Sequence, residues 1–558
     1  MPDAPSPILA IIVIIGLALG VSAILAERRR TKILARVRES WGASPGHLWN
    51  VDALASLYRS RCSAEPPADA LDDRTWSDLH LDAVLATIDR TESSLGQQAL
   101  YHRVRTLRTE TDLAAFESLV ERMATDVDAR QRAQVSLSAL RDSSGFDVWW
   151  IAQPGVLDRQ PWQVVYPLLA LVMVGLFAWA MYWPGAILIA FAVTLLNVGI
   201  RSAAARRFAP LVGPFRQIAA VTGVARSVAR VAAGDANPLL EPLRQDLPSL
   251  TRLHKMIRWM GRHPSVDGEI TATIAEYLNL LLLADVNAVY FASHEARLRG
   301  PALFRVAAAL GDLDAAISVA SFRAGATGWT RPTFVPSGDP ASFRELCHPL
   351  VADPVANSID LGPPFGVIVT GSNMSGKTTF IRTVGVNVVL AQTIQTCLAS
   401  AYRAPVLRVQ SCIGRSDDLI AGKSYYLVEV EAVLSMVNAS AQGSPHLFLF
   451  DELFRGTNTV ERIAAGEAVL AELLRDERHF VIAATHDGEL VDLLRGTYAL
   501  FHFADELGSE GLQFTFRMKD GPATTRNAIA LLRLHGAPEA LVVRATDRAA
   551  ALDQCGGL

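Results

Sequence analysis

The stretch Gly371-Ser-Asn-Met-Ser-Gly-Lys-Thr378 decides the fold of the C-terminal part of this chain. It fits the pattern G-x-x-x-x-G-K-[ST], in which glycines let backbone N–H groups turn inward onto phosphate oxygens. The apolar run 365–370 before it predicts a buried strand, and 379–390 after it predicts a helix. Strand, glycine loop and helix in this order are the context that phosphate binding requires, because the helix N-terminus adds its partial positive charge.

The loop predicts a site for ATP or another nucleotide with Mg²⁺. Lys377 is expected to reach the β- and γ-phosphates and so to act in catalysis, and Thr378 is expected to hold Mg²⁺. The residues predicted to bind the nucleotide are Gly371, Ser372, Asn373, Met374, Ser375, Gly376, Lys377, Thr378 and Thr379.

Two later apolar runs, 445–450 and 480–485, also read as buried strands that end in polar residues. The first delivers Asp451 and Glu452, and the second delivers His486. Asp451 is expected to bind Mg²⁺ through water, and Glu452 to polarise the attacking water. His486 is expected to sense the γ-phosphate or to steady that water. The alternatives are an ordinary strand that ends in surface acids and a structural histidine.

Composition limits the class of protein. A chain of 558 residues is too long for one hydrophobic core, so about two to four domains are expected. The net charge of −4 gives no global basic field, so nucleic-acid affinity of the whole chain is not implied. The cysteines are scattered without a C-x-x-C pair, which predicts reduced thiols rather than a disulfide framework or a zinc site. They are Cys62, Cys347, Cys397, Cys412 and Cys555.

The segment 8–26 has nineteen residues without a charge and nearly matches a hydrocarbon core of roughly 30 Å. Arg28 and its basic neighbours follow at once. A secretory signal peptide would carry its positive charges before the apolar run. The segment therefore predicts an uncleaved anchor with the N-terminus outside and the basic flank in the cytoplasm. A cleaved signal and a buried core helix are the alternatives.

A second apolar run, 162–200, has thirty-nine uncharged residues. As one helix it would be about 58 Å long, twice the thickness of a bilayer core. Tyr182-Trp-Pro-Gly185 marks a break, so we expect two spans joined as a hairpin. Arg201 and the arginines after it place both ends in the cytoplasm. The sequence thus predicts a multi-pass plasma-membrane protein with three spans and a cytoplasmic bulk.

The remaining parts are helical before the strand–helix alternation begins. The segments 267–297 and 301–324 predict two long helices, and Arg331-Pro332 marks a boundary. From Phe365 onward strand and helix alternate, as in an α/β nucleotide-binding domain.

These motifs together resemble the MutS family, the ATPases of DNA mismatch repair and their relatives. The segment 371–379 is similar to that family's Walker A motif, and 451–459 to its Asp-Glu-x-x-Arg-Gly-Thr-x-Thr segment. The segment 417–429 looks like its signature segment, and Thr485-His486 like its switch. His348-Pro349 resembles the entry to its ATPase domain.

The resemblance extends to the family's helical core. The segment 89–96 is similar to the start of that core, and 313–320 to its end. The fold class implied is an α/β P-loop ATPase head of ABC type after an all-α lever domain, with three transmembrane helices. The predicted domains are an anchor at 1–36, a helical core at 37–340 interrupted by the hairpin 162–200, and an ATPase domain at 341–558.

The resemblance implies a homodimer with composite ATP sites. In the family the signature serine of one subunit reaches the nucleotide of the other, and that residue would be Ser424 here. The segment 524–538 resembles the helix-rich dimerisation end. The cofactors implied are ATP and Mg²⁺, and the macromolecular partner implied is DNA, through mismatched DNA binding and DNA repair.

The chain departs from mismatch-reading members of the family. An anchor and a short segment stand where those members carry a large domain with a Phe-x-Glu wedge, and little length remains for the clamp that crosses DNA. These departures count against mismatch recognition and leave DNA binding open. The leading hypothesis is a membrane-anchored MutS-like ATPase whose cycle moves helical levers. The alternative is a membrane-tethered module that grips DNA ends or branches. A half of an ABC transporter predicts an LSGGQ signature and more spans, and neither is present.

Overall fold

The computed structural model describes the residues on which every structural statement below rests. They are residues 7–45, 51–61, 69–141, 161–232, 234, 236–257, 269–372, 375–414, 425–508, 511–522, 529, 532–533 and 536–554.

The chain forms two compact units, each built from several segments. We call the first the helical unit; it comprises Met1–Ala64, Ile88–His102 and Ala114–Gly325. We call the second the sheet unit; it comprises Glu65–Thr87, Arg103–Leu113 and Ala326–Leu558. Both units combine segments that are separated in the sequence, whereas the three domains predicted above are contiguous, and their boundaries remain a prediction.

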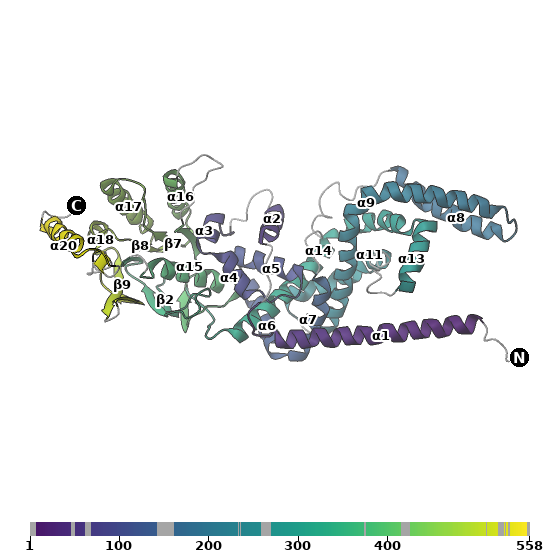
Figure 1. The fold of residues 1–558 in the computed structure, drawn as a ribbon, viewed down its shortest axis with the longest axis horizontal. Helices are drawn as coiled ribbons and strands as arrows, with labels where there is room; N and C mark the ends of the chain where they lie inside the picture. Colours follow the sequence, from purple (N-terminus) through teal and green to yellow (C-terminus); the bar gives the residue numbers. More distant parts are fainter. Residues whose placement is uncertain are drawn as a thin grey trace. The chain divides into compact units, whose positions relative to one another are not determined.

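The helical unit contains α-helices and a few short 3₁₀ turns (Figure 1). The α-helices are α1 Pro7–Glu39, α2 Val51–Arg61, most of α5 Ser94–Arg105, most of α6 Glu110–Thr125, α7 Val127–Leu137, α8 Val165–Ala180, α9 Ala186–Val231, α10 Glu241–Gln245, α11 Thr251–Ile257, α13 Glu269–Leu282 and α14 Ala284–Gly325.

The predicted apolar hairpin is confirmed as helices α8 and α9, which lie side by side (Figure 1). The chain turns at 181–185, as expected from the proline and glycine there. Among the described residues two helical segments, Pro161–Ala180 and Ala186–Ala203, are long and apolar enough to cross a membrane, by length and composition alone. The predicted span 8–26 lies within α1 and is not one of these two.

The predicted boundary between the helices 267–297 and 301–324 is wrong. Helix α14 continues through Pro301, and the break lies earlier, at Leu283. Leu283 has a positive φ of 50° and is buried, and the Asn287 side chain donates to the Leu282 carbonyl (2.9 Å). A proline inside a helix removes one backbone hydrogen bond, which the rest of a long packed helix tolerates.

Asp314 of α14 holds the start of α5 inside the helical unit. Its carboxylate accepts hydrogen bonds from the backbone N–H groups of Glu92 (2.9 Å) and Ser93 (2.8 Å) and from the Ser93 hydroxyl (2.6 Å). A side chain at Gly96 would collide with it, because an added Cβ would lie 2.3 Å from Oδ2. Burial raises the pKa of Asp314 to about 7, although these hydrogen bonds act in the opposite direction.

This raised pKa predicts a pH-dependent stability. A carboxyl group whose pKa is higher in the folded state contributes stability below its unfolded value of about 4, and that contribution is lost as pH rises through about 7. We expect Asp314→Asn to reduce the fall in thermal midpoint between pH 5.5 and 8, compared with the unchanged protein. Asp128→Asn, at an exposed position of α7, is the control. An identical pH dependence in both variants would contradict the prediction.

The sheet unit alternates strands and helices, which confirms the predicted α/β character. Its elements are α3 Asp73–Asp78, most of α4 Leu81–Ile88, β1 Thr333–Phe334, β2 Ala341–Leu346, β3 Asn357–Leu361, β4 Gly366–Thr370, α15 Lys377–Ile394, β5 Ala401–Ala404, β6 Arg408–Cys412, α16 Tyr425–Ser440, β7 His446–Asp451, α17 Thr459–Leu473, β8 Phe480–Ala484, α18 Gly488–Leu494, β9 Ala499–Gly508, β10 Gly511–Asp520 and α20 Glu539–Gln554.

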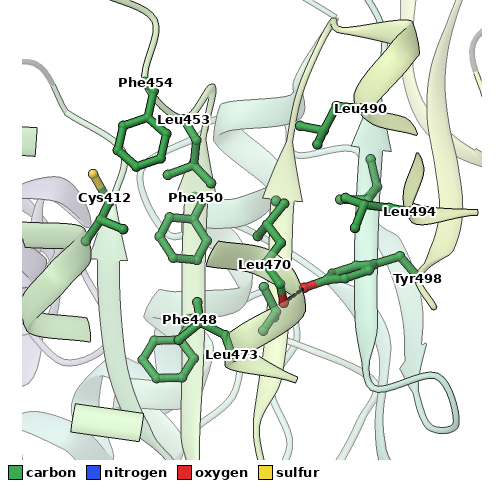
Figure 2. Close-up of a cluster of buried hydrophobic side chains, with 14 of the residues drawn as sticks. Cys412, Phe448, Phe450, Leu453, Phe454, Leu470, Leu473, Leu490, Leu494 and Tyr498 are labelled. Atoms are coloured by element: carbon green, nitrogen blue, oxygen red, sulfur yellow. Dashed lines mark hydrogen bonds between the residues drawn. The ribbon is translucent and has the colours of Figure 1, made fainter. Parts of the chain in front are cut away.

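A six-stranded sheet in the order β10-β9-β4-β8-β7-β6 forms the centre of this unit. The strands from β9 to β6 are parallel, and β10 pairs antiparallel with β9. Phe448 and Phe450 of β7 pack with Leu470 and Leu473 of α17 in a buried cluster (Figure 2). Tyr498 closes the cluster, and its hydroxyl donates to the Leu470 carbonyl (2.8 Å). A smaller sheet has the order β1-β5-β2-β3.

A residue far earlier in the chain completes the end of β6. Asp78, at the end of α3, is buried and accepts hydrogen bonds from the Ser411 hydroxyl (2.8 Å) and from the N–H groups of Ile413 (2.9 Å) and Gly414 (2.8 Å). The Asp78 carbonyl also accepts from Arg382 Nε (2.8 Å). These contacts explain why the segment Glu65–Thr87 belongs to the sheet unit.

Candidate functional site

The predicted site residues follow three neighbouring parallel strands, β4, β8 and β7. Val369 of β4 pairs with Ala484 of β8, and Ala484 pairs with Asp451 of β7. The carboxyl ends of these strands therefore meet at one edge of the sheet. Ligands of open parallel sheets bind at this edge.

The glycine loop after β4 leaves room that a side chain would fill. Gly371 has a φ of +142°, and an added Cβ would lie 2.9 Å from Ser375 Oγ and 3.0 Å from the Phe503 carbonyl oxygen. Gly376 has a φ of +110° and caps the N-terminus of α15. Within the described part of the chain the buried Ser375 hydroxyl has no hydrogen-bond partner. The loop forms a backbone cradle, and its buried hydroxyl can donate to an oxygen atom. This arrangement fits the phosphate groups of a nucleotide.

Lys377 lies inside this cradle. Its ammonium group donates to the carbonyls of Gly371 and Ser372, at 2.7 Å each, and its side chain is buried. Thr379 belongs to the same first turn of α15. Asn373 and Met374 lie outside the described residues. The arrangement brings a positive charge and a helix N-terminus to one point, and both favour an anion.

Thr378 and Asp451 contact each other across the site. The Thr378 hydroxyl donates to Asp451 Oδ2 at 2.6 Å. Burial raises the pKa of Asp451, and the bond from Thr378 acts against that shift. A hydroxyl and a carboxylate are hard oxygen ligands of the kind that Mg²⁺ takes when it keeps several waters and binds substrate phosphates. The pair therefore fits the predicted magnesium position.

Glu452 and His486 form a second pair beside the first. His486 Nδ1 lies 3.0 Å from Glu452 Oε1, and Arg455 pairs with the other carboxylate oxygen. Burial acts to raise the pKa of Glu452, but the bond and charge of His486, with Arg455 and Lys377, leave it lowered. The same bond raises the pKa of His486. The arrangement holds Glu452 ionised with one face toward the imidazole.

The backbone at Glu452 and Phe454 is strained. Both residues have a φ of +56°, which is unusual for residues other than glycine. The Glu452 N–H donates to the Ala484 carbonyl (2.9 Å), and the Phe454 N–H donates to Glu429 of α16 (2.6 Å). Strain that the surrounding structure holds in place is common at functional sites. Here it directs the Glu452 carboxylate toward His486.

Three residues of the site were not predicted from the sequence, namely Arg462, Phe516 and Asn357. Arg462 of α17 makes a two-pronged ion pair with Asp487, at 3.0 and 2.6 Å, and so fixes the residue after His486. Phe516 of β10 is exposed, and its ring approaches Gly376 so closely that an added Cβ would lie 3.3 Å away. The sequence held no signal for Phe516, because its position depends on an irregularity in the pairing of β10 with β9.

Asn357 of β3 supports this irregularity. Its Nδ2 donates to the Phe516 carbonyl (2.9 Å), and its Oδ1 accepts from the Met518 N–H (2.8 Å). An exposed aromatic ring is thereby held beside the glycine loop. The predicted trans residue Ser424 and the first part of the predicted signature segment, 417–424, lie outside the described residues, whereas its remaining residues, 425–429, begin α16.

Comparison with known proteins identifies the family to which the C-terminal domain belongs. The family profile described as MutS domain V matches residues 367–553, which include the glycine loop and the strands that carry Asp451 and His486. These residues therefore form a domain of the MutS family.

Curated relatives match the same half of the chain. A DNA mismatch repair protein MutS from Thermus caldophilus is 34% identical over 264 residues, which are 46% of this chain and 31% of the relative. A DNA mismatch repair protein MutS 2 from Halobacterium salinarum is 36% identical over 250 residues, 43% of this chain and 28% of the relative. The matches thus cover about a third of the length of these relatives.

Proposed function

We propose that this protein is a membrane-held ATPase of the MutS family, in which ATP binding and hydrolysis change the arrangement of a dimer and its helical levers. The observation that carries the proposal is the meeting of the Thr378–Asp451 and Glu452–His486 pairs at one edge of the sheet. MutS family proteins are ATPases, and residues 367–553 match the domain of that family.

Each pair has a distinct part in this proposal. Lys377 and the loop bind the phosphates, and Thr378 with Asp451 would hold Mg²⁺. Bound ATP would supply the γ-phosphoryl group for transfer to water. Glu452 has a lowered pKa and stays ionised at neutral pH, so it can accept the proton of a water molecule. His486 orients Glu452, and its raised pKa favours the protonated imidazole that stabilises negative charge.

The membrane part of the proposal rests on the hairpin α8–α9. Its outer residues are strongly exposed, with Leu188 at 75% and Leu171 at 70%, and a bilayer would cover them. The predicted anchor 8–26 in α1 adds a third span. Positive residues after each apolar segment favour a plasma-membrane protein with the N-terminus outside and the sheet unit in the cytoplasm.

The partners proposed are a second copy of the chain, the lipid bilayer and DNA. In a homodimer Ser424 would complete the nucleotide site of the partner subunit. DNA is proposed because the relatives are named DNA mismatch repair proteins. Binding that weakens steeply with salt would support it, because phosphate contacts release counterions. Absence of binding at low salt would leave ATP hydrolysis at the membrane as the whole function.

Lys377→Ala tests the proposed ATPase. We expect loss of ATP hydrolysis by the protein in liposomes, because the ammonium group that reaches the phosphates is gone. Lys519→Ala, at an exposed position of β10, is the matched control and should hydrolyse ATP normally. Hydrolysis by Lys377→Ala at the unchanged rate would refute the assignment of the site.

Phe516→Ala tests the base-binding side of the site. We expect about tenfold weaker ATP binding with little change in the maximal rate, because base stacking on an aromatic ring contributes about 1–3 kcal/mol. Phe516→Tyr should retain wild-type affinity, since the ring is kept. The measurement is the dissociation constant of a fluorescent ATP analogue, and equal affinity of all three proteins would exclude Phe516 from the site.

A further inference from the structure

The helix break at Leu283 lies against the apolar hairpin. Leu282, the last residue of α13, packs against a buried cluster formed by Met173 and Leu176 of α8 and Ala190 of α9. Leu283 belongs to a second buried cluster, with Tyr166 of α8 and Val286 of α14, and Ile200 of α9 packs against this cluster. The chain therefore approaches the hairpin along α13, turns at Leu283 and withdraws along the start of α14.

Charges show how far the segment enters. Arg201, the first charge after the apolar part of α9, makes a two-pronged ion pair with Glu276 of α13, at 2.7 and 3.1 Å. From Glu276, α13 runs antiparallel to α9, because its Leu281 carbonyl meets Asn197, about one turn before Arg201. Leu282, six residues after Glu276, lies about 9 Å further along α13 at 1.5 Å per residue. Asp285 follows the turn in the sequence, and the chain returns.

The backbone groups freed by the break are satisfied by side chains. Asn197 of α9 is fully buried, and its Nδ2 donates to the Leu281 carbonyl (2.8 Å). Asn287 of α14 donates to the Leu282 carbonyl (2.9 Å). Irregular backbone occurs at membrane depth only where protein or water satisfies its polar groups, and these asparagines meet that requirement.

An exposed tyrosine points to a shallow position of α13. The free face of α13 carries Tyr277, which is 63% exposed at the level of Glu276. Tyrosine is enriched at this depth of a membrane.

We propose that α13 and the first turns of α14 form a re-entrant segment that enters the cytoplasmic leaflet beside the hairpin and contacts phospholipid through α13. The proposal rests on the proposed membrane insertion of α8 and α9 and extends it to a segment that the sequence presented as part of a soluble helix. Lipid is the occupant because the end of α13 packs against the hairpin, whose exposed apolar residues include Leu171 and Leu188.

Photo-crosslinking to lipid tests the proposal. The residue p-benzoylphenylalanine replaces Tyr277, Leu188 or Val460, one at a time, in the full chain in phosphatidylethanolamine–phosphatidylglycerol vesicles with a radiolabelled phospholipid. Leu188 reports the hairpin, and Val460 is an exposed position of the sheet unit. We expect crosslinks to lipid from positions 188 and 277 and none from 460.

The outcomes separate this proposal from the one on which it rests. Lipid crosslinks at 188 without any at 277 would overturn the re-entrant segment and leave the anchored hairpin intact. A crosslink from 277 to a second copy of the chain would overturn it as well. No crosslink at 188 would refute membrane insertion and the re-entrant segment together.

The role of the asparagine has its own test. Asn197→Ala is expected to reduce lipid crosslinking from position 277 severalfold, because the Leu281 carbonyl loses its donor. Thr194→Ala is the matched control, one turn away on α9, since among the described residues the Thr194 hydroxyl bonds within its own helix, to the Ala190 carbonyl (2.8 Å). Equal crosslinking in both variants would remove Asn197 from the proposal.

Discussion

Glu452→Gln is expected to lower ATP hydrolysis by a factor of about 10²–10⁴, the usual contribution of a general base, while ATP binding remains. The amide keeps the size of the side chain but cannot accept a proton from water. The phosphate-binding residues Ser375 and Lys377 are unchanged, so the protein should hold ATP without turning it over. Single-turnover hydrolysis and equilibrium binding of ATP, measured on the same preparation, check both parts.

The control for this variant is Glu461→Gln at the start of α17. Glu461 is exposed and accepts a hydrogen bond from Thr457 (3.1 Å) outside the pair that Glu452 forms with His486. It should hydrolyse ATP at the unchanged rate. Hydrolysis by Glu452→Gln within tenfold of the unchanged protein would show that another group takes the proton.

Glu117→Gln is expected to destabilise the helical unit by about 3–5 kcal/mol, the usual cost of breaking a buried ion pair. Glu117 of α6 accepts two hydrogen bonds of 2.7 Å from Arg323 of α14, and both side chains are at least nine-tenths buried. The substitution keeps the volume and removes the negative charge, so the guanidinium group stays buried without the charge of Glu117. Chemical unfolding followed by circular dichroism measures the loss.

Glu121→Gln is the control for this stability prediction, because Glu121 lies one turn later on α6 at an exposed position. Its unfolding should change by less than about 0.5 kcal/mol, as is usual for surface substitutions. A loss as small for Glu117→Gln would mean that water or another side chain reaches Arg323.

The polar residues at the sheet edge could be predicted because a local sequence pattern marks their positions. Each strand is a short apolar run followed at once by its polar residue, as in β7 with Asp451 and β8 with His486. Parallel strands bring such residues to one edge of a sheet, whatever lies between them in the chain. At the glycine loop a strand, a turn and a helix follow one another directly in the sequence, so this part of the site could also be predicted.

The supporting residues could not be predicted, since they depend on contacts between distant segments. Asp78 and Ser411 are more than three hundred positions apart, and the local sequence around neither residue predicts their contact. Phe516 reaches Gly376 only because the pairing of β10 slips by an irregularity that Asn357 holds. Local patterns carry no register, so an exposed phenylalanine in a strand looks like any other.

The predicted helix boundary between residues 297 and 301 was wrong for a related reason. Proline is a strong local signal for a helix end, so the end of the helix was predicted just before Pro301. Leu283 carries no such signal, and its turn depends on the asparagine side chains of neighbouring helices. Tertiary contacts overrode local propensity at both positions.

The way Asp78 completes the end of β6 limits how the molecule can be divided. A fragment that begins at Ala326 would contain every strand of the sheet unit but would lack Glu65–Thr87 and Arg103–Leu113. The N–H groups of Ile413 and Gly414 would lose their acceptor, and the exposed edge would invite aggregation. Expression of the C-terminal half alone should therefore give insoluble protein, and co-expression with a separate piece that carries residues 65–113 should restore solubility.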